Sequence, residues 1–115
     1  MTIAIYHNPR CSKSRAALKL LEESGAAVKV VLYLETPPSE QELRALLKKL
    51  GVAPRALMRT KEARFRELGL DAPGVSDDNL IRAMVENPIL IERPIAIAGR
   101  RAVIGRPPET VLGLL

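Results

Sequence analysis

The sequence has a single cysteine, Cys11, and a single histidine, His7. One cysteine cannot form an intramolecular disulfide, and one cysteine with one histidine cannot supply the usual ligand set of a zinc site. A disulfide framework and a Cys/His metal centre are therefore excluded, and we expect no bound metal. Because free thiols are typical of reducing compartments, we expect a cytoplasmic protein.

Long apolar runs are also missing. The longest is a handful of residues, and residues 1–7 show no basic segment followed by an apolar one. A membrane helix needs about 20 apolar residues, and an export signal needs an apolar core behind basic residues. We therefore expect neither a membrane segment nor an export signal.

Aromatic side chains are scarce, with only Tyr6, Tyr33 and Phe65 in the chain. The formal net charge is +5, from 18 Lys and Arg against 13 Asp and Glu, but the basic residues are scattered and few rings could stack on bases. We therefore do not expect nucleic-acid binding. Arginine outnumbers lysine by 12 to 6, and its planar fork suits a small oxyanion.

The chain length and composition fit one domain. Apolar residues make up 47% of the 115 residues and are spread along the chain without repeats. We predict a single domain over residues 1–115, and a monomer, because no feature indicates a stable dimer.

The N-terminal part has the pattern of a βαβ unit. Residues 2–7 and 28–34 are predicted strands, and residues 12–24 a helix that ends at Gly25. A right-handed crossover of this kind joins parallel strands. Cys11 then stands at the N-terminus of the helix.

The middle of the chain is predicted to be helical. Ser39 and Glu42 form a capping box for a helix that ends at Gly51, and Ser76 begins another that ends near Asn87. Shorter helical pieces are expected over residues 54–58 and 61–68.

The C-terminal part has the pattern of a ββα unit. Residues 95–98 and 101–104 flank Gly99 and Arg100 as a hairpin, and residues 109–114 form a last helix. Together these elements predict an α/β, thioredoxin-like fold: a four-stranded mixed sheet (βαβ…ββα) with an inserted helical segment.

Cys11 is the strongest candidate for chemistry. A helix N-terminus and the nearby Arg10, Lys13 and Arg15 lower a thiol pKa, and the first amides of the helix can hold an anion. A buried structural cysteine is the alternative, but the strand-to-helix junction favours a functional thiol. Ser14 replaces the second cysteine of a Cys-x-x-Cys motif, so an external thiol must release any covalent adduct.

Four further residues could act with the thiol. His7 could ionise it or be structural, and its spacing alone leaves both open. Arg93 precedes Pro94, where thioredoxin-like folds place a cis-proline beside the catalytic cysteine. Arg106 and Arg59 could also converge on the thiol, although ordinary surface positions are the alternative for each.

Five segments together resemble the glutaredoxin-dependent arsenate reductase family (ArsC-like, short branch). They are residues 7–15, 33–38, 55–59, 93–95 and 105–109, in the same order and at similar spacing. The sequence differs from the best-characterised members because Ser12 and Lys13 replace the Gly-Thr pair usual after the cysteine.

The resemblance implies an arsenate reductase that reduces arsenate to arsenite. Glutathione would be the thiol co-substrate and glutaredoxin the protein partner, with no cofactor bound. In the implied site, Cys11 is the nucleophile and His7 helps to ionise it. Ser14 and Arg15 would support the anion loop. An arginine triad would bind the substrate: Arg59, Arg93 and Arg106.

Two other functions stay open. A Cys-x-x-Ser motif on this fold also resembles monothiol glutaredoxins, which suggests a glutathione-dependent thiol transferase. A Spx-like regulator of transcription, which binds RNA polymerase, is the other alternative. The arginines disfavour the first, and Ser14 in place of a second switch cysteine disfavours the second.

Overall fold

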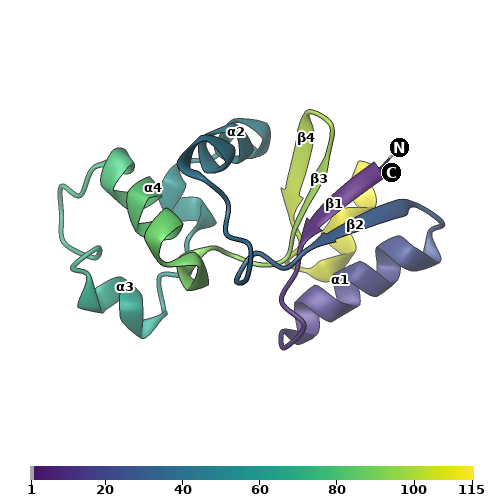
Figure 1. The fold of residues 1–115 in the computed structure, drawn as a ribbon, viewed down its shortest axis with the longest axis horizontal. Helices are drawn as coiled ribbons and strands as arrows, with labels where there is room; N and C mark the ends of the chain where they lie inside the picture. Colours follow the sequence, from purple (N-terminus) through teal and green to yellow (C-terminus); the bar gives the residue numbers. More distant parts are fainter. Residues whose placement is uncertain (1) are drawn as a thin grey trace. The chain divides into compact units, whose positions relative to one another are not determined.

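The computed structural model describes residues 2–115 and divides the chain into two compact units. One unit comprises the residues up to Thr36 together with Arg93–Leu115, and the other comprises Pro37–Glu92. Figure 1 labels their helices and strands. Over residues 2–115, no helix combines the length and apolar character needed to cross a bilayer.

The first unit is a four-stranded sheet with helical segments packed on it. Its strands are β1 (Thr2–Tyr6), β2 (Ala27–Val31), β3 (Ile95–Ala98) and β4 (Arg101–Ile104), in the order β2-β1-β3-β4. β1 pairs in parallel with β2 and antiparallel with β3, and β3 pairs antiparallel with β4. This confirms the predicted α/β class and mixed sheet.

Two helical segments bury one face of this sheet. The helix α1 (Ser12–Glu23) joins β1 to β2, and the 3-10 segment η3 (Pro108–Leu114) follows β4. Burying a large aliphatic side chain stabilises a fold by about 1.5–3 kcal/mol, so this face supplies much of the unit's stability. The core consists of Ile3, Ile5, Ala17, Leu21, Ala96, Ala98, Val111 and Leu114.

Strand register brings three chain segments to one end of the sheet. Tyr6, the last residue of β1, pairs with Ile95, the first residue of β3. Ile95 also pairs with Ile104, the last residue of β4. The segments after β1, before β3 and after β4 therefore meet at this end of the sheet. They contain Cys11, Arg93 and Arg106, respectively.

Strand β2 is shorter than the sequence predicted. The β-branched run ends at Val31, and the chain then turns, because Glu35 and Thr36 both donate backbone hydrogen bonds to the Leu32 carbonyl at 2.9 Å. β1 itself ends at Tyr6, and beyond it only the His7 amide still donates to Val31, at 2.9 Å. Because β1 is the partner strand and ends at Tyr6, residues 32–34 have no strand residues to pair with.

The second unit contains α2 (Glu40–Leu50), η1 (Pro54–Leu57), α3 (Ala63–Glu67), α4 (Asp77–Glu86) and η2 (Pro88–Leu90). The predicted capping box is present, with Glu42 N–H donating to Ser39 Oγ at 3.1 Å and Ser39 N–H donating to Glu42 Oε1 at 3.0 Å.

Several helix ends in the chain follow the predicted signals. Gly51 adopts a left-handed conformation with φ 68°, and its N–H donates to Leu47 at 2.8 Å, which ends α2. Asn79 N–H donates to Ser76 Oγ at 3.2 Å and so caps α4. The last predicted helix is instead the 3-10 segment Pro108–Leu114, whose 7 residues exceed the length of about 3–4 that is usual for such a segment.

Candidate active site

Cys11 is the N-cap of α1, as the sequence predicted. Its backbone is extended, at φ −96° and ψ 121°, and its carbonyl accepts the first helical hydrogen bond from Arg15 N–H at 3.0 Å. Its own N–H donates to the Asn8 carbonyl at 3.0 Å, which closes a turn between β1 and the helix. The Cys11 side chain is partly exposed. The sulfur is therefore accessible at the positive end of the helix dipole.

The surroundings of Cys11 favour its thiolate form. Partial burial tends to raise the pKa of the thiol, but hydrogen bonds to the sulfur from the Ser14 backbone, the Arg93 side chain and the Lys13 backbone oppose this. The positive charge of Arg93 acts in the same direction, and the pKa of Cys11 is lowered overall. A lowered pKa raises the thiolate fraction at neutral pH, and the thiolate is the nucleophile.

Arg106 also reaches the sulfur. Its Nη2 lies 3.8 Å from Cys11 Sγ, while its Nε donates to the Arg93 carbonyl at 2.9 Å. Both arginines precede cis-prolines, in the peptide bonds Arg93-Pro94 and Arg106-Pro107. The β3–β4 hairpin thus brings two of the three predicted oxyanion-binding arginines to the thiol.

His7 and Ser14 form a buried hydrogen-bonded pair. His7 Nδ1 and Ser14 Oγ are 2.6 Å apart, and Asn8 N–H donates to the same hydroxyl at 3.0 Å. Burial, and then the nearby charge of Arg15, lower the pKa of His7, while Glu22 acts in the opposite direction. Ser14 therefore links a mainly neutral imidazole to the first turn of α1. Direct action of His7 on the thiol stays a prediction.

Arg15 and Asn8 fix the shape of the turn. Arg15 Nη1 donates to the Pro9 carbonyl at 2.8 Å, which ties the first turn of α1 to the preceding loop. Asn8 Oδ1 accepts a hydrogen bond from Arg10 N–H at 3.0 Å. Asn8 was not among the predicted site residues, although an Asn-Pro pair is a known sequence signal for this side-chain-to-backbone turn.

Arg59 belongs to the second unit, where two carboxylates surround it. Its guanidinium pairs with Glu62, and its Nε lies 3.8 Å from Glu92 Oε1. Its backbone N–H donates to the Leu90 carbonyl at 2.7 Å. Neither glutamate was a predicted site residue, and only Glu62, three residues after Arg59, has a local signal in the sequence. Convergence of Arg59 on the thiol stays a prediction.

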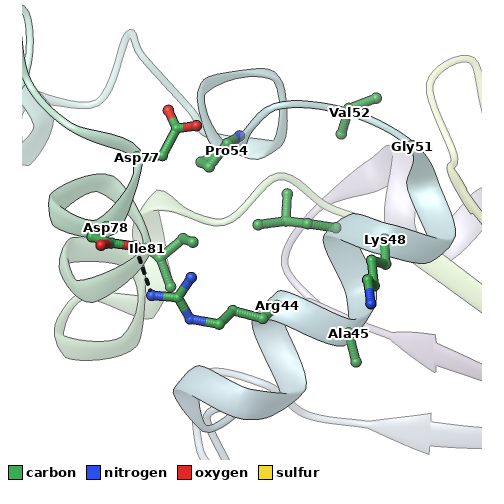
Figure 2. A pocket seen from close by; sticks show the side chains of 10 residues that line it. Arg44, Ala45, Lys48, Gly51, Val52, Pro54, Asp77, Asp78 and Ile81 are labelled. Carbon is green, nitrogen blue, oxygen red and sulfur yellow. Dashed lines mark hydrogen bonds and ion pairs between the residues drawn. The ribbon is translucent and has the colours of Figure 1, made fainter.

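A groove of about 940 Å³ lies within the second unit, and Figure 2 shows its lining side chains. Arg44 of α2 crosses it to Asp78 of α4, with Nη2 and Oδ1 2.8 Å apart. None of the predicted site residues lines this groove. Among residues 2–115, no group of three or more His, Cys, Asp or Glu side chains is arranged to hold a metal ion.

Comparison with known proteins identifies the family of this chain. The ArsC family matches residues 6–114. The chain is 53% identical over 114 residues to a protein of Neisseria meningitidis serogroup A named arsenate reductase, covering 98% of this chain and 97% of that one. It is 55% identical over 114 residues to the uncharacterized protein YfgD of Escherichia coli (strain K12), covering 98% and 96%.

A solved structure shows the same fold. The arsenate reductase from Vibrio cholerae superposes with a TM-score of 0.97 at 52% identity, covering 100% of this chain and 98% of that one. The family match covers nearly the whole chain, and the similar proteins match over the same length with the same fold. This chain belongs to the ArsC family.

Proposed function

We propose that this protein is an arsenate reductase in which Cys11 is the nucleophile and in which glutathione and glutaredoxin supply the electrons. The observation that carries the proposal is the Arg106 guanidinium 3.8 Å from Cys11 Sγ. Two relatives, from Neisseria meningitidis and Vibrio cholerae, carry the name arsenate reductase, which supports arsenate as the substrate.

The site suits a compact tetrahedral oxyanion. Arg93 and Arg106 supply planar donors that can bind two oxygens each, and the first amides of α1 point towards the same sulfur. These donors stabilise negative charge both on arsenate before attack and on the oxygen that leaves. A thiol that only exchanged disulfides would not need two guanidinium groups beside it.

The first chemical step joins sulfur to arsenic. The Cys11 thiolate attacks arsenic, one arsenic–oxygen bond breaks, and the departing oxygen leaves as water after taking up protons. Arsenic stays pentavalent in the adduct, because both bonding electrons of the new bond come from sulfur. The glutathione thiol then displaces a second oxygen as water and gives an adduct with two sulfur–arsenic bonds.

The second part of the cycle reduces arsenic. A glutaredoxin thiolate attacks the glutathione sulfur and forms a mixed disulfide, and the electron pair of the broken sulfur–arsenic bond remains on arsenic, which becomes trivalent. Water then cleaves the bond between Cys11 and arsenic, releasing arsenite and restoring the thiol. An external thiol fits this chain, since Ser14 stands where a second cysteine would be.

The remaining site residues support this chemistry in our proposal. His7 acts on the thiol through Ser14, because these two side chains share the buried hydrogen bond. Ser14 and Arg15 hold the anion loop in shape through their contacts with Asn8 and Pro9. Arg59 completes the substrate site as the third arginine.

The proposed cycle bears on the cofactor, the cellular compartment and the oligomeric state of the protein. Electrons come from thiols, so no bound cofactor is needed. We place the protein in the cytoplasm, where glutathione is reduced, and we propose that it acts as a monomer.

The decisive experiment is arsenate-dependent NADPH oxidation with glutathione, glutaredoxin and glutathione reductase supplied. We expect turnover by the wild type, none by Cys11→Ser, and little change in Ser12→Ala, a matched change at an exposed position. Turnover without glutaredoxin would contradict the proposed electron donor. Arg59→Ala, compared with the exposed Arg64→Ala, tests the third arginine through the KM for arsenate.

A thiol transferase is the second candidate, supported by the lowered pKa of a lone, accessible thiol. The same coupled assay separates the two functions when it is run in parallel with arsenate and with a glutathionylated peptide as the substrate. Turnover of the peptide without any turnover of arsenate would favour the transferase.

A further inference from the structure

Gly105 connects the last strand of the sheet to Arg106. Its N–H donates to the Pro94 carbonyl at 2.8 Å, so it continues the pairing between the two hairpin strands by one hydrogen bond. The Arg106 Nε bond to the Arg93 carbonyl, at 2.9 Å, lies directly beside it. One backbone hydrogen bond and one side-chain-to-backbone hydrogen bond thus hold the two Arg-Pro segments together.

No side chain fits at Gly105. A Cβ atom placed there would lie 2.7 Å from Pro94 Cγ and 3.0 Å from Val111 Cγ1. Pro94 Cγ cannot swing away as the end of a free side chain could, because the ring is closed on its own backbone nitrogen, directly after Arg93. Val111 is fully buried in the core. A methyl group at position 105 would therefore displace one of the two Arg-Pro segments.

We propose that Gly105 is a positioning residue for the oxyanion site, because its missing side chain lets the Arg93-Pro94 and Arg106-Pro107 segments approach closely enough to present both guanidinium groups to Cys11. The link to oxyanion capture rests on the proposed function. The link to the thiol does not, because Arg93 and Arg106 both contact the Cys11 sulfur.

Gly113 offers a matched control. It lies in η3 of the same unit, and a Cβ at this position would meet no atom within 4 Å. Gly113→Ala therefore makes the same chemical change without pushing on either arginine segment. A positioning role predicts that only Gly105→Ala alters the thiol, whereas a general effect of replacing glycine predicts similar results for both.

The experiment measures two properties of Gly105→Ala, Gly113→Ala and the wild type. The pH dependence of thiolate absorbance reports the Cys11 pKa, and coupled turnover reports kcat and the KM for arsenate and for glutathione. We expect Gly105→Ala to raise the Cys11 pKa and to raise the arsenate KM about tenfold or more, with a much smaller change in the glutathione KM. We expect wild-type values for Gly113→Ala.

Folding is measured alongside by thermal unfolding. If Gly105→Ala does not fold, Gly105→Ala combined with Val111→Ala removes the contact with Val111 while leaving the contact with Pro94. A folded variant with wild-type Cys11 pKa and arsenate KM would overturn the proposal. Failure of both variants to fold would also overturn it, because Gly105 would then serve core packing alone. Absence of arsenate turnover in the wild type would refute the proposed function but leave the thiolate comparison intact.

Discussion

One guanidinium group, that of Arg106, contacts both the backbone of Arg93 and the sulfur of Cys11. Its Nε donates to the Arg93 carbonyl at 2.9 Å, and its Nη2 lies 3.8 Å from Cys11 Sγ. The first contact fixes the plane of the guanidinium, and the second directs its charge towards the sulfur. Only a fork with several N–H groups can make both contacts at once.

Arg106→Lys is therefore expected to fail almost as completely as Arg106→Ala. A lysine ammonium can face the sulfur or the Arg93 carbonyl, but it cannot hold a fixed plane between them. Removing one preorganised donor of this kind typically lowers kcat about 100-fold or more. The measurement is kcat/KM for arsenate, with Arg100→Lys in the exposed hairpin turn as the control. A lysine variant with near-wild-type activity would show that charge alone is sufficient.

The second prediction concerns the pH at which Cys11 becomes reactive. Arg93 lowers the Cys11 pKa through a hydrogen bond and through its charge. Its removal in Arg93→Ala should therefore shift the midpoint of iodoacetamide alkylation to higher pH and slow alkylation at neutral pH. Lys19→Ala, at an exposed position of α1, should leave the midpoint in place. An unchanged midpoint in Arg93→Ala would mean that Arg93 does not activate the thiol, and that the helix N-terminus and Arg106 are sufficient.

The placement of Arg93 and Arg106 near each other follows from the sequence. The predicted hairpin has the observed bounds. Its pairing of Ile95 with Ile104, continued by two residues beyond the strand ends, places Arg93 opposite Arg106. The Nε bond to the Arg93 carbonyl could not be predicted, because it depends on the rotamer of one side chain and on a close approach that Gly105 permits.

Ser14, a predicted site residue, is buried at the start of α1, whereas Ser12 is exposed. Ser14 is buried because it shares a helix face with Ala17 and Leu21, three and seven residues further along. That spacing is visible in the sequence and could have identified Ser14 as an inward-facing residue. Its partner His7 was identifiable only as a strand-end histidine, because the direction of the imidazole depends on packing.

Ser14→Ala is expected to destabilise the fold. The hydroxyl is fully buried and is the partner of both His7 Nδ1 and Asn8 N–H, so its removal leaves two buried polar groups without that partner. Leaving a buried polar group unsatisfied costs about 1–3 kcal/mol of unfolding free energy. Urea unfolding measures the loss, and Ser12→Ala at an exposed position is the matched control. Equal effects of the two changes would contradict a structural role for the Ser14 hydroxyl.

The lowered pKa of His7 predicts how stability responds to acid. Burial is the first cause, followed by the charge of Arg15, and the folded-state pKa lies below the ordinary value of 6.5. The unfolded chain therefore binds a proton more readily than the folded chain between these two values. The stability contributed by neutral His7 is fully present above about pH 6.5 and is lost as the pH falls towards the folded-state pKa.

His7→Asn isolates this contribution, because the asparagine amide can take the place of Nδ1 opposite Ser14 but does not titrate. The unfolding free energy of the wild type should fall more steeply than that of His7→Asn as the pH is lowered below about 6.5. Above that pH, the difference between the two proteins should be constant. Urea unfolding at a series of pH values provides the comparison. Parallel curves across the acid range would mean that folding does not perturb the imidazole, and the buried contact with Ser14 would then have to accommodate its charged form.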